Sequence, residues 1–299
     1  MIIYHRTSML DSAAQTVVNT VNCVGVMGKG LAAEFKARYP DMFTAYKRIC
    51  DSKLLEPGKL WLWKADDQWV LNFPTKKHWR SPSRIDWIET GLAKFCDHYE
   101  RLGIEEIAFP KLGCGNGNLD WDLVRPVMER YLDPLPITVF VHDHEYNLGL
   151  PEHIEALISG NATLPAPQSS DDVWNAILRA SEKVGSEMVD LESKQPFCFS
   201  AKNDIVLIES GSDRSFFERD EIDDIWRIFR SGILTKKRLG ISDPSESSKL
   251  ISLFSLMPNA RPVPIARPGK EEFEVAVERR PKRGTASEVP NDQLSLSWH

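Results

Sequence analysis

The stretch Val18–Lys36 reads VNTVNCVGVMGKGLAAEFK, in which a nearly continuous apolar run enters a glycine-spaced loop that opens directly into a helical pattern. This order places flexible backbone and free N–H groups at a helix N-terminus, where unpaired donors and the helix dipole favour an anion. A second glycine-rich stretch, KLGCGNGNLDW over Lys111–Trp121, also follows a strand pattern. Two such loops in one domain predict a ligand with more than one phosphate.

Both loops also have an ordinary structural interpretation. Asn19 and Asn22 flank the end of the first strand pattern, and their side chains are suited to satisfying loose backbone groups in a tight turn. Alternate glycines over Gly113–Gly117 cost backbone entropy and add little stability, which favours close approach of a ligand. The N–H groups of this second loop would then form an anion-binding nest.

Around these loops, residues 1–150 alternate strand and helix patterns, which predicts a layered α/β domain. Strand patterns fall at residues 1–6, 16–21, 59–64, 68–73, 104–110 and 136–142. Helical patterns fall at residues 29–39, 40–49, 83–102 and 121–132. Ser81 and Pro82 are predicted to start the third helix, and Pro126 to lie in the first turn of the fourth.

The rest of the chain predicts a second, smaller domain. Glycine, serine, asparagine and several prolines favour a linker over residues 151–170. Residues 171–266 predict a small α+β domain, with a hairpin that turns at Asn203–Asp204. Residues 267–299 are charged and nearly free of large apolar side chains, which predicts a disordered tail.

Composition excludes several classes of protein. The net charge of −6 argues against broad nonspecific affinity for nucleic acid, because that affinity comes from excess lysine and arginine. The five cysteines are scattered and never spaced C-x-x-C, so we expect reduced thiols, no zinc site and no disulfide framework. We also expect no other metal and no cofactor. Neither a signal peptide nor an apolar run of membrane-spanning length is present, which predicts a cytoplasmic protein with no membrane partner.

Between the two loops, NFPTKKHWR over Asn72–Arg80 follows a strand, where ligands of α/β sheets commonly bind. Lys76 and Lys77 are adjacent, so only one of them faces a given side of an extended backbone. Both are consistent with solvated surface lysines. Alternatively, partial burial of one lowers its pKa and makes it a nucleophile. His78 is consistent with a general acid, a phosphate contact or simple packing, and Arg80 with a phosphate contact or plain exposure.

Three motifs in order carry a resemblance to a known family. VNTVNCVGVMGKGLA, NFPTKKHW and FPKLGCGNGNLDW are similar to the macrodomain family, an ADP-ribose-binding α/β fold with a mixed central sheet flanked by helices. Within this family they resemble the bacterial DNA ADP-ribosyl glycohydrolase antitoxins and, less closely, the human terminal ADP-ribose protein glycohydrolase. The resemblance covers roughly residues 1–145.

The resemblance implies roles for individual residues. It places the catalytic lysine at Lys76, the loop lining the distal ribose and diphosphate at Asn22–Gly30, and a second phosphate loop at Gly113–Gly117. The implied substrate-binding residues are Ser8, Asn19, Asn22, Val26, Met27, Gly28, Lys29, Gly30, Thr75, Gly113, Cys114, Gly115, Asn116 and Gly117.

Two departures from the family pattern matter. A Gly-Asp pair that often contacts the adenine is replaced by Thr7-Ser8, so we expect Ser8 or backbone groups to contact it. An acid present in the human enzyme's second loop is replaced by Gly117, which leaves His78 and Asp120 as candidate acid–base groups.

The function implied is lysine-dependent removal of ADP-ribose from a modified DNA base, reversing the action of an ADP-ribosyltransferase toxin. The acidic composition favours a short or single-stranded DNA target. Alternatives are hydrolysis of ADP-ribose from protein or small molecules, and non-catalytic reading of ADP-ribose. By analogy of position, residues 171–266 would bind the cognate toxin, and the acidic stretch Glu218–Asp224 would imitate DNA phosphates; a purely supporting module is the alternative.

Overall fold

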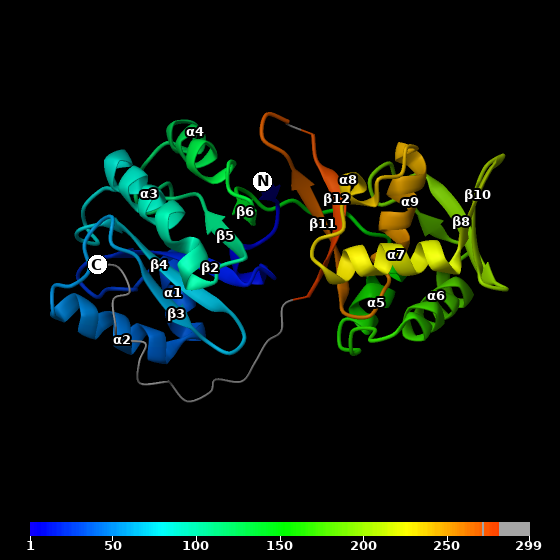
Figure 1. Cartoon of the computed structure of the whole chain (residues 1–299), viewed down its shortest axis with the longest axis horizontal. Helices are drawn as coiled ribbons and strands as arrows, with labels where there is room; N and C mark the ends of the chain where they lie inside the picture. The colour runs from blue at the N-terminus through cyan, green and yellow to red at the C-terminus, as the bar shows by residue number, and fades with distance from the viewer. Residues whose placement is uncertain (271, 281–299) are drawn as a thin grey trace. The chain divides into compact units, whose positions relative to one another are not determined.

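The chain forms two compact units in the computed structural model, which describes residues 1–270 and 272–280. The first unit contains residues 1–145 and 267–269 (Figure 1). The second contains residues 146–266 and the described part of 270–280. Within these ranges, none of the helices combines the length and the apolar character needed to cross a membrane.

The sheet of the first unit has strands in the order β1-β6-β5-β2-β4-β3. These strands are β1 (Ile2–His5), β2 (Thr16–Asn22), β3 (Trp61–Lys64), β4 (Trp69–Lys76), β5 (Glu106–Pro110) and β6 (Thr138–His142). All neighbours pair in parallel except β3, which pairs antiparallel with β4. The strands are apolar and largely buried, because helices cover both faces. The predicted mixed α/β sheet is therefore confirmed.

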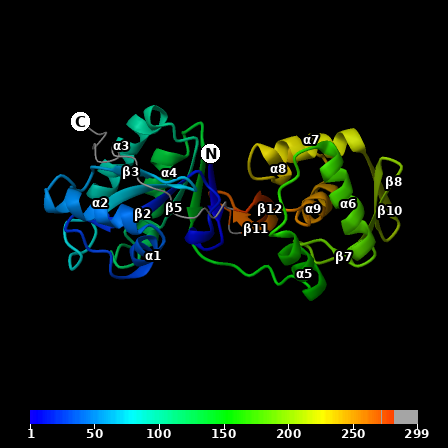
Figure 2. The ribbon, with the colours of Figure 1, turned by 90° about the horizontal axis from the view of Figure 1, so that it is seen from below.

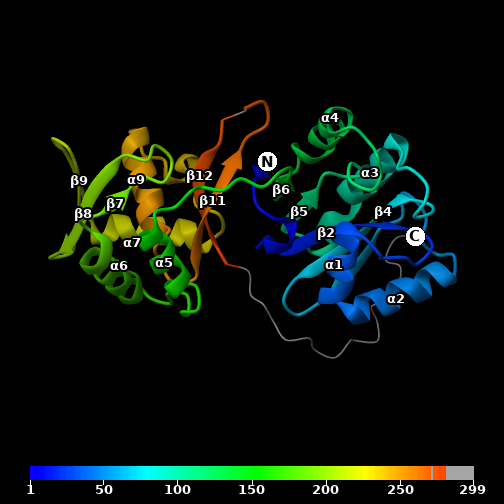
Figure 3. The same cartoon turned by 180° about the vertical axis from the view of Figure 1, so that it is seen from behind.

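Two helices lie on each face of this sheet. The helices are α1 (Gly30–Arg38), α2 (Pro40–Asp51), α3 (Ile85–Leu102) and α4 (Trp121–Leu132). Figures 1 and 3 show α1 and α2 on one face and α3 and α4 on the other. Right-handed crossovers require this arrangement, since the chain moves one way along the sheet from β2 to β4 and the opposite way from β4 through β5 to β6.

The same topology creates a crevice at the carboxyl edge of the sheet. β2 lies between β4 and β5 in the sheet. The helices that follow β2 lie on one face of the sheet, whereas the helices that follow β4 and β5 lie on the other (Figure 1). Such a switch point is where ligands bind in open α/β sheets. The two glycine loops and the segment after β4 therefore converge there.

Two helix starts differ from the prediction. Helix α3 begins at Ile85, because Arg84 before it has extended backbone and is the N-cap; the Ser83 N–H is bonded to the Gly117 carbonyl at 2.9 Å. Pro126 is the sixth residue of α4 instead of lying in its first turn, because Asp120 caps that helix by accepting from the Asp122 N–H.

The second unit has its own apolar core. The predicted linker over 151–170 is wrong in part, because α5 (Glu152–Asn161) forms there and buries Ile154 and Ile158 in that core. The other helices of the unit are α6 (Ser170–Val184), α7 (Arg219–Arg230), α8 (Lys236–Leu239) and α9 (Pro244–Phe254).

An antiparallel sheet of order β10-β9-β8-β7 lies in this unit. Its strands are β7 (Met188–Val189), β8 (Pro196–Lys202), β9 (Ile205–Ser210) and β10 (Asp213–Glu218). The predicted hairpin is confirmed, and Asn203 and Asp204 both have positive φ, as a tight two-residue turn requires. Helix α6 packs against β8 (Figure 2).

A further pair of strands corrects the predicted disordered tail over 267–299. β12 (Glu274–Arg279) pairs antiparallel with β11 (Ala260–Ala266), and its Val275, Ala276 and Val277 are buried. Residues 281–299 of the predicted tail lie outside the described residues.

Candidate functional site

A cavity of about 720 Å³ lies at the carboxyl edge of the first unit's sheet. All of its lining residues belong to that unit. They are Thr20, Val21, Asn22, Val26, Gly28, Lys29, Gly30, Leu31, Ala32, Thr75, Lys76, Trp79, Arg80, Pro110, Lys111, Gly113, Gly115, Asn116, Gly117 and His142. Eleven of the predicted site residues are thus brought together: Asn22, Val26, Gly28, Lys29, Gly30, Thr75, Lys76, Gly113, Gly115, Asn116 and Gly117.

The first glycine loop is organised by Asn22. Its side-chain oxygen accepts from the Val24 and Val26 N–H groups at 3.0 and 3.3 Å, and its amide donates to the Val26 carbonyl at 2.5 Å. The Tyr46 hydroxyl donates to the Asn22 carbonyl at 2.7 Å and anchors the loop to α2. Hydrogen bonds of the Asn22 and Tyr46 side chains therefore fix the conformation of the loop that leads to α1.

The N-terminus of α1 forms one wall of the cavity. Lys29 is its N-cap and makes no side-chain capping hydrogen bond, while Gly30, Leu31 and Ala32 line the cavity. Gly30 has φ of +56°, and a Cβ there would lie 3.1 Å from the Asn116 amide nitrogen. The two glycine loops consequently lie against each other and present a helix start that attracts anions.

The second glycine loop is closed by its own backbone. The Asn118 N–H donates to the Gly115 carbonyl at 3.1 Å, and the Leu119 N–H donates to the Gly113 carbonyl at 3.1 Å. Gly113 has φ of +71°, a region that glycine adopts at no steric cost. A Cβ on Gly117 would lie 2.1 Å from the Gly113 carbonyl oxygen, so only glycine fits this position.

Of the two adjacent lysines, Lys76 faces the cavity. Its side chain is buried at the end of β4, and its amine donates to the Asn116 carbonyl of the second loop. Burial lowers the pKa of the Lys76 amine from its usual value. Lys77 is exposed and its amine lies 5.7 Å from the centre of the Trp87 ring. The alternation along β4 thus separates a buried amine from a solvated one.

The cavity wall is strongly cationic. It contains Lys29, Lys76, Arg80 and Lys111, and the residues that line it include no carboxylate. Lys29, Arg80 and Lys111 form no ion pair with any carboxylate in the described part of the chain. A chain of net charge −6 therefore has an electrostatically positive cavity.

Four predicted binding residues do not line the cavity. Asn19 and Met27 are fully buried beneath it, where the Asn19 amide donates to the Asn72 side chain at 3.0 Å. The Cys114 thiol points to the Leu112 carbonyl, and Ser8 is the N-cap of a short 3-10 helix over Met9–Asp11. Asn19 and Met27 therefore support the first loop from below.

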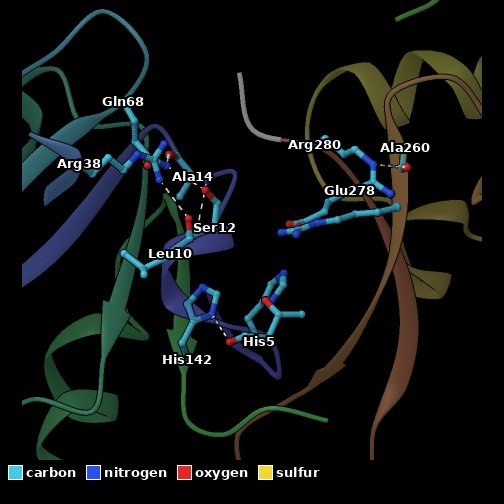
Figure 4. Close-up of polar contacts among 12 residues, drawn as sticks. His5, Leu10, Ser12, Ala14, Arg38, Gln68, His142, Ala260, Glu278 and Arg280 are labelled. Atoms are coloured by element: carbon cyan, nitrogen blue, oxygen red, sulfur yellow. Dashed lines mark hydrogen bonds and ion pairs between the residues drawn. The ribbon is translucent and has the colours of Figure 1, made fainter. Parts of the chain in front are cut away.

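The two predicted acid–base candidates also lie off the cavity wall. Asp120 is engaged as the N-cap of α4, and His78 accepts a hydrogen bond from the Arg80 N–H at 3.2 Å. The imidazole that does line the cavity is His142, at the end of β6. Its Nδ1 donates to the Thr7 carbonyl at 2.9 Å, and its ring stacks on His5 (Figure 4).

Sequence reasoning missed several other lining residues: Thr20, Val21, Leu31, Ala32, Trp79, Pro110 and Lys111. Thr20, Val21 and Pro110 lie at strand ends, and Leu31 and Ala32 lie in the first turn of α1. All seven lie within the three motifs, so membership of a motif was the signal available for them. His142, by contrast, ends a strand that carries no loop motif.

Part of the first unit is similar to known proteins. Residues 18–128 match the family model described as Macro domain. The DNA ADP-ribosyl glycohydrolase of Mycobacterium tuberculosis is 43% identical over 140 residues, which cover 46% of this chain and 40% of that protein. A DNA ADP-ribosyl transferase-DNA ADP-ribosyl glycohydrolase fusion protein of Thermosipho africanus is 40% identical over 153 residues, covering 45% and 39%.

The match to the family model, residues 18–128, lies within the first unit. The matched region spans about two fifths of the length of these relatives. Among solved structures, the macrodomain of Mycobacterium tuberculosis DarG is 40% identical and covers 48% of this chain and 97% of its own, with a TM-score of 0.47.

Proposed function

Because the N-terminal unit of this chain is a macrodomain, we propose that its cavity binds ADP-ribose and that the unit removes ADP-ribose from a modified DNA base. The observation that carries the proposal is a buried lysine with a lowered pKa in a cationic cavity between two glycine loops. The DNA acceptor is supported by the activity named for the relatives that are 43% and 40% identical.

The diphosphate would lie between the two glycine loops. The start of α1 offers N–H groups and the positive end of a helix dipole, and the second loop offers further N–H groups around Gly113–Gly117. Lys29 and Lys111 add positive charge without a competing carboxylate on the wall. Ligands without the diphosphate would leave these buried donors unpaired, which gives discrimination for ADP-ribose.

In the proposed reaction, the Lys76 nitrogen attacks the anomeric carbon of the distal ribose as the bond from that carbon to the base breaks. The electron pair of the broken bond leaves with the base, which takes up one proton, while the lysine nitrogen gives one up. The sugar ring of the adduct opens to an imine. Water then adds to the imine carbon, the carbon–nitrogen bond breaks, and ADP-ribose leaves with the lysine restored as a free amine.

The position of Lys76 favours this chemistry. Its amine is tied to the Asn116 carbonyl, so the nucleophile is held against the loop that would bind the diphosphate. Holding the amine and the sugar together replaces a bimolecular encounter by an intramolecular step. His142 lines the same cavity, whereas the other two candidate acid–base groups, His78 and Asp120, lie outside its wall. His142 is therefore better placed than either of them for proton transfer.

Turnover of an ADP-ribosylated oligonucleotide tests the proposal. Lys76→Ala should lower the rate of ADP-ribose release by about 100-fold or more, because it removes the attacking group. Lys77→Ala is the matched control, since that lysine is exposed and off the cavity wall, and its rate should stay within about threefold of wild type. Equal rates for wild type and Lys76→Ala would refute the lysine mechanism.

Other acceptors and a reading role make distinct predictions for the same cavity. Hydrolysis of ADP-ribose from protein carboxylates or small molecules would appear as higher kcat/KM on those substrates than on DNA. A non-catalytic reader would bind ADP-ribose in calorimetry and turn over none of the three substrate classes. The buried amine disfavours a reader, because reading requires no nucleophile.

For the second unit, we propose binding of a cognate ADP-ribosyltransferase toxin, so that the chain acts as an antitoxin. The support is the Thermosipho africanus relative, whose name joins a transferase and a glycohydrolase in one chain. The acidic stretch Glu218–Asp224 is a poor imitation of DNA phosphates. Its Glu218 and Glu221 form a capping box, Asp223 accepts from Ser170, and Asp224 pairs with Arg227.

A further inference from the structure

A tight turn after β4 presents a tryptophan and an arginine at the mouth of the cavity. The Ser81 N–H donates to the His78 carbonyl at 3.0 Å, which closes a four-residue turn with Trp79 and Arg80 at its two central positions. The His78 ring accepts from the Arg80 N–H at 3.2 Å and fixes the turn from within. Both central side chains line the cavity, so the turn is part of its rim.

The Trp79 side chain is unusually open for its size. Trp79 is 46% exposed, whereas Trp61 and Trp63 of β3 are buried in the core and Trp69, Trp87 and Trp121 are half-buried. Central turn positions are usually taken by small polar residues or proline, because these satisfy the turn at no cost in exposed apolar surface. An exposed indole at this position forgoes the free energy that burial of its apolar surface would provide. This cost points to a ligand that covers the indole when it binds.

The neighbours of Trp79 supply flat and cationic groups. The His78 ring lies nearly parallel to the indole with 5.4 Å between ring centres, and the Arg80 guanidinium carbon lies 4.4 Å from the indole centre. Arg80 forms no ion pair with any carboxylate in residues 1–270 and 272–280, whereas the nearby Arg84 is paired with Asp86 at 2.9 Å. One unneutralised cation and one exposed ring therefore meet at the rim, and the His78 ring packs against that ring.

From this arrangement we infer that Trp79 and Arg80 form a stacking platform for unpaired bases of single-stranded DNA that flank the ADP-ribosylated base. The inference rests on the proposed function, and it adds how the acceptor is held. A base stacks on the exposed indole, and the Arg80 guanidinium stacks on a base or pairs with a phosphate. We call Trp79 and Arg80 the stacking rim.

A single strand fits the rim better than a duplex. Indole and guanidinium faces bind the flat side of a base, which is covered in a duplex and available in a single strand. The base that carries ADP-ribose must also leave its stack to bring the sugar to Lys76.

The test compares two substrates that carry the same ADP-ribosylated base. One is a single-stranded oligonucleotide of about ten nucleotides, and the other is the corresponding ADP-ribosylated mononucleotide, which has no flanking bases. In Trp79→Ala, the ratio of kcat/KM for the oligonucleotide to kcat/KM for the mononucleotide should fall about tenfold. Trp79→Phe should keep most of this ratio, because phenylalanine retains a stacking face. Arg80→Ala should lower the ratio and should also make it less dependent on salt concentration.

Matched controls lie on the same unit away from the cavity. Leu123→Ala removes an exposed apolar side chain of α4 that is 65% exposed, and Arg48→Ala removes an exposed cation of α2. Both should leave the substrate ratio within twofold of wild type. Wild type should also favour the single strand over the same sequence in a duplex by about tenfold.

The possible outcomes separate this inference from the proposed function. An unchanged ratio in Trp79→Ala overturns the stacking rim while leaving the glycohydrolase proposal intact. Trp79-dependent turnover of an ADP-ribosylated protein in preference to the oligonucleotide also overturns it, because the rim would then dock a peptide. If wild type turns over neither DNA substrate, the proposed function fails. The stacking rim is then tested by fluorescence anisotropy instead of by turnover. Weaker binding of a labelled, unmodified single strand by Trp79→Ala than by wild type then supports it, and equal binding overturns it.

Discussion

Gly117 and Gly115 stand two residues apart in the second glycine loop, and the space around them differs sharply. A Cβ on Gly117 would lie 2.1 Å from the Gly113 carbonyl oxygen and 2.3 Å from the Ser83 hydroxyl, whereas a Cβ on Gly115 meets nothing within 4 Å. Gly117→Ala should therefore lower the free energy of unfolding by about 1–3 kcal/mol. Gly115→Ala is the matched control and should change it by less than about 0.5 kcal/mol.

Urea unfolding of both variants measures this difference. Gly117→Ala should also weaken ADP-ribose binding in calorimetry, because the displaced loop carries the Asn116 carbonyl that holds the Lys76 amine. Equal stability of the two variants would show that the loop relaxes freely and that its shape is not fixed by this contact.

The lowered pKa of Lys76 predicts the pH dependence of the proposed reaction. Burial disfavours the charged amine, so the proton leaves at a lower pH than the usual lysine value of about 10.4. Only the neutral amine attacks carbon, so the rate should rise with pH through the lowered pKa and level off above it. A profile of kcat against pH should place the midpoint of this limb below about 10.4. If the pH profile of Lys76→Ala rises with the same midpoint, the titration belongs to a group other than Lys76.

The sequence predicted the lysine that lines the cavity better than the residues around it. Alternation required Lys76 and Lys77 to face opposite sides but left open which of them faces the ligand. The resemblance assigned that position to Lys76, and the structure places Lys76 on the cavity wall. Asn19 and Met27 lie within the first motif, yet both are buried and neither lines the cavity. For Asn19, the sequence could not show which face of β2 meets the cavity, because this strand is covered on both sides. His142 could not be found, since it reaches the cavity only through the pairing of β6 with β5.

Among the elements, the contact of α3 with β4 sets the position of the strand that ends in Lys76. Gly91 of α3 packs on the buried Phe73 ring, and a Cβ there would lie 2.3 Å from the ring. Gly91→Ala should lower the free energy of unfolding by about 1–3 kcal/mol, although alanine is favoured over glycine inside a helix by about 1 kcal/mol. Chemical denaturation with circular dichroism measures this change.

Gly160 of α5 is the matched control for Gly91, because a Cβ there meets nothing within 4 Å. Gly160→Ala should raise the free energy of unfolding by up to about 1 kcal/mol, since only helix propensity changes. A stabilised Gly91→Ala variant would mean that α3 moves away from β4 without cost, and the close helix–strand contact would then not position Lys76.

The elements that were predicted well are those with strong local periodicity. Helix α3 shows an apolar stripe along its length, and the hairpin of β8 and β9 carries an Asn-Asp turn. β11 contains Pro262 and Pro264, which lower the strand signal because proline donates no ladder hydrogen bond. β12 is short and charged at both ends, so only its pairing with β11 reveals it. The connection between the two strands is longer than a tight turn, so no turn motif predicts their pairing.

For the molecule as a whole, net charge gave an incomplete guide to function. The acidic total excludes a general nucleic-acid binder, yet the residues that line the cavity are cationic and include no carboxylate. Composition averages over two units, and the second contributes the acidic start of α7. Charge must therefore be assigned to each unit before a partner is inferred from it.

The division into two units predicts how the proposed activities separate. Every residue that lines the cavity lies between Thr20 and His142, and the second unit has its own apolar core. A chain that ends after Glu145 should therefore bind ADP-ribose with a Kd within about threefold of the full chain and should retain turnover of the ADP-ribosylated oligonucleotide. The same truncated chain should lose capture of the cognate ADP-ribosyltransferase, because the proposed toxin-binding surface lies in residues 146–280. Calorimetry, turnover and pull-down with the transferase on one pair of chains measure all three quantities. Full capture of the transferase by the truncated chain would move the toxin-binding surface to the macrodomain, and loss of ADP-ribose binding would show that the cavity depends on the second unit.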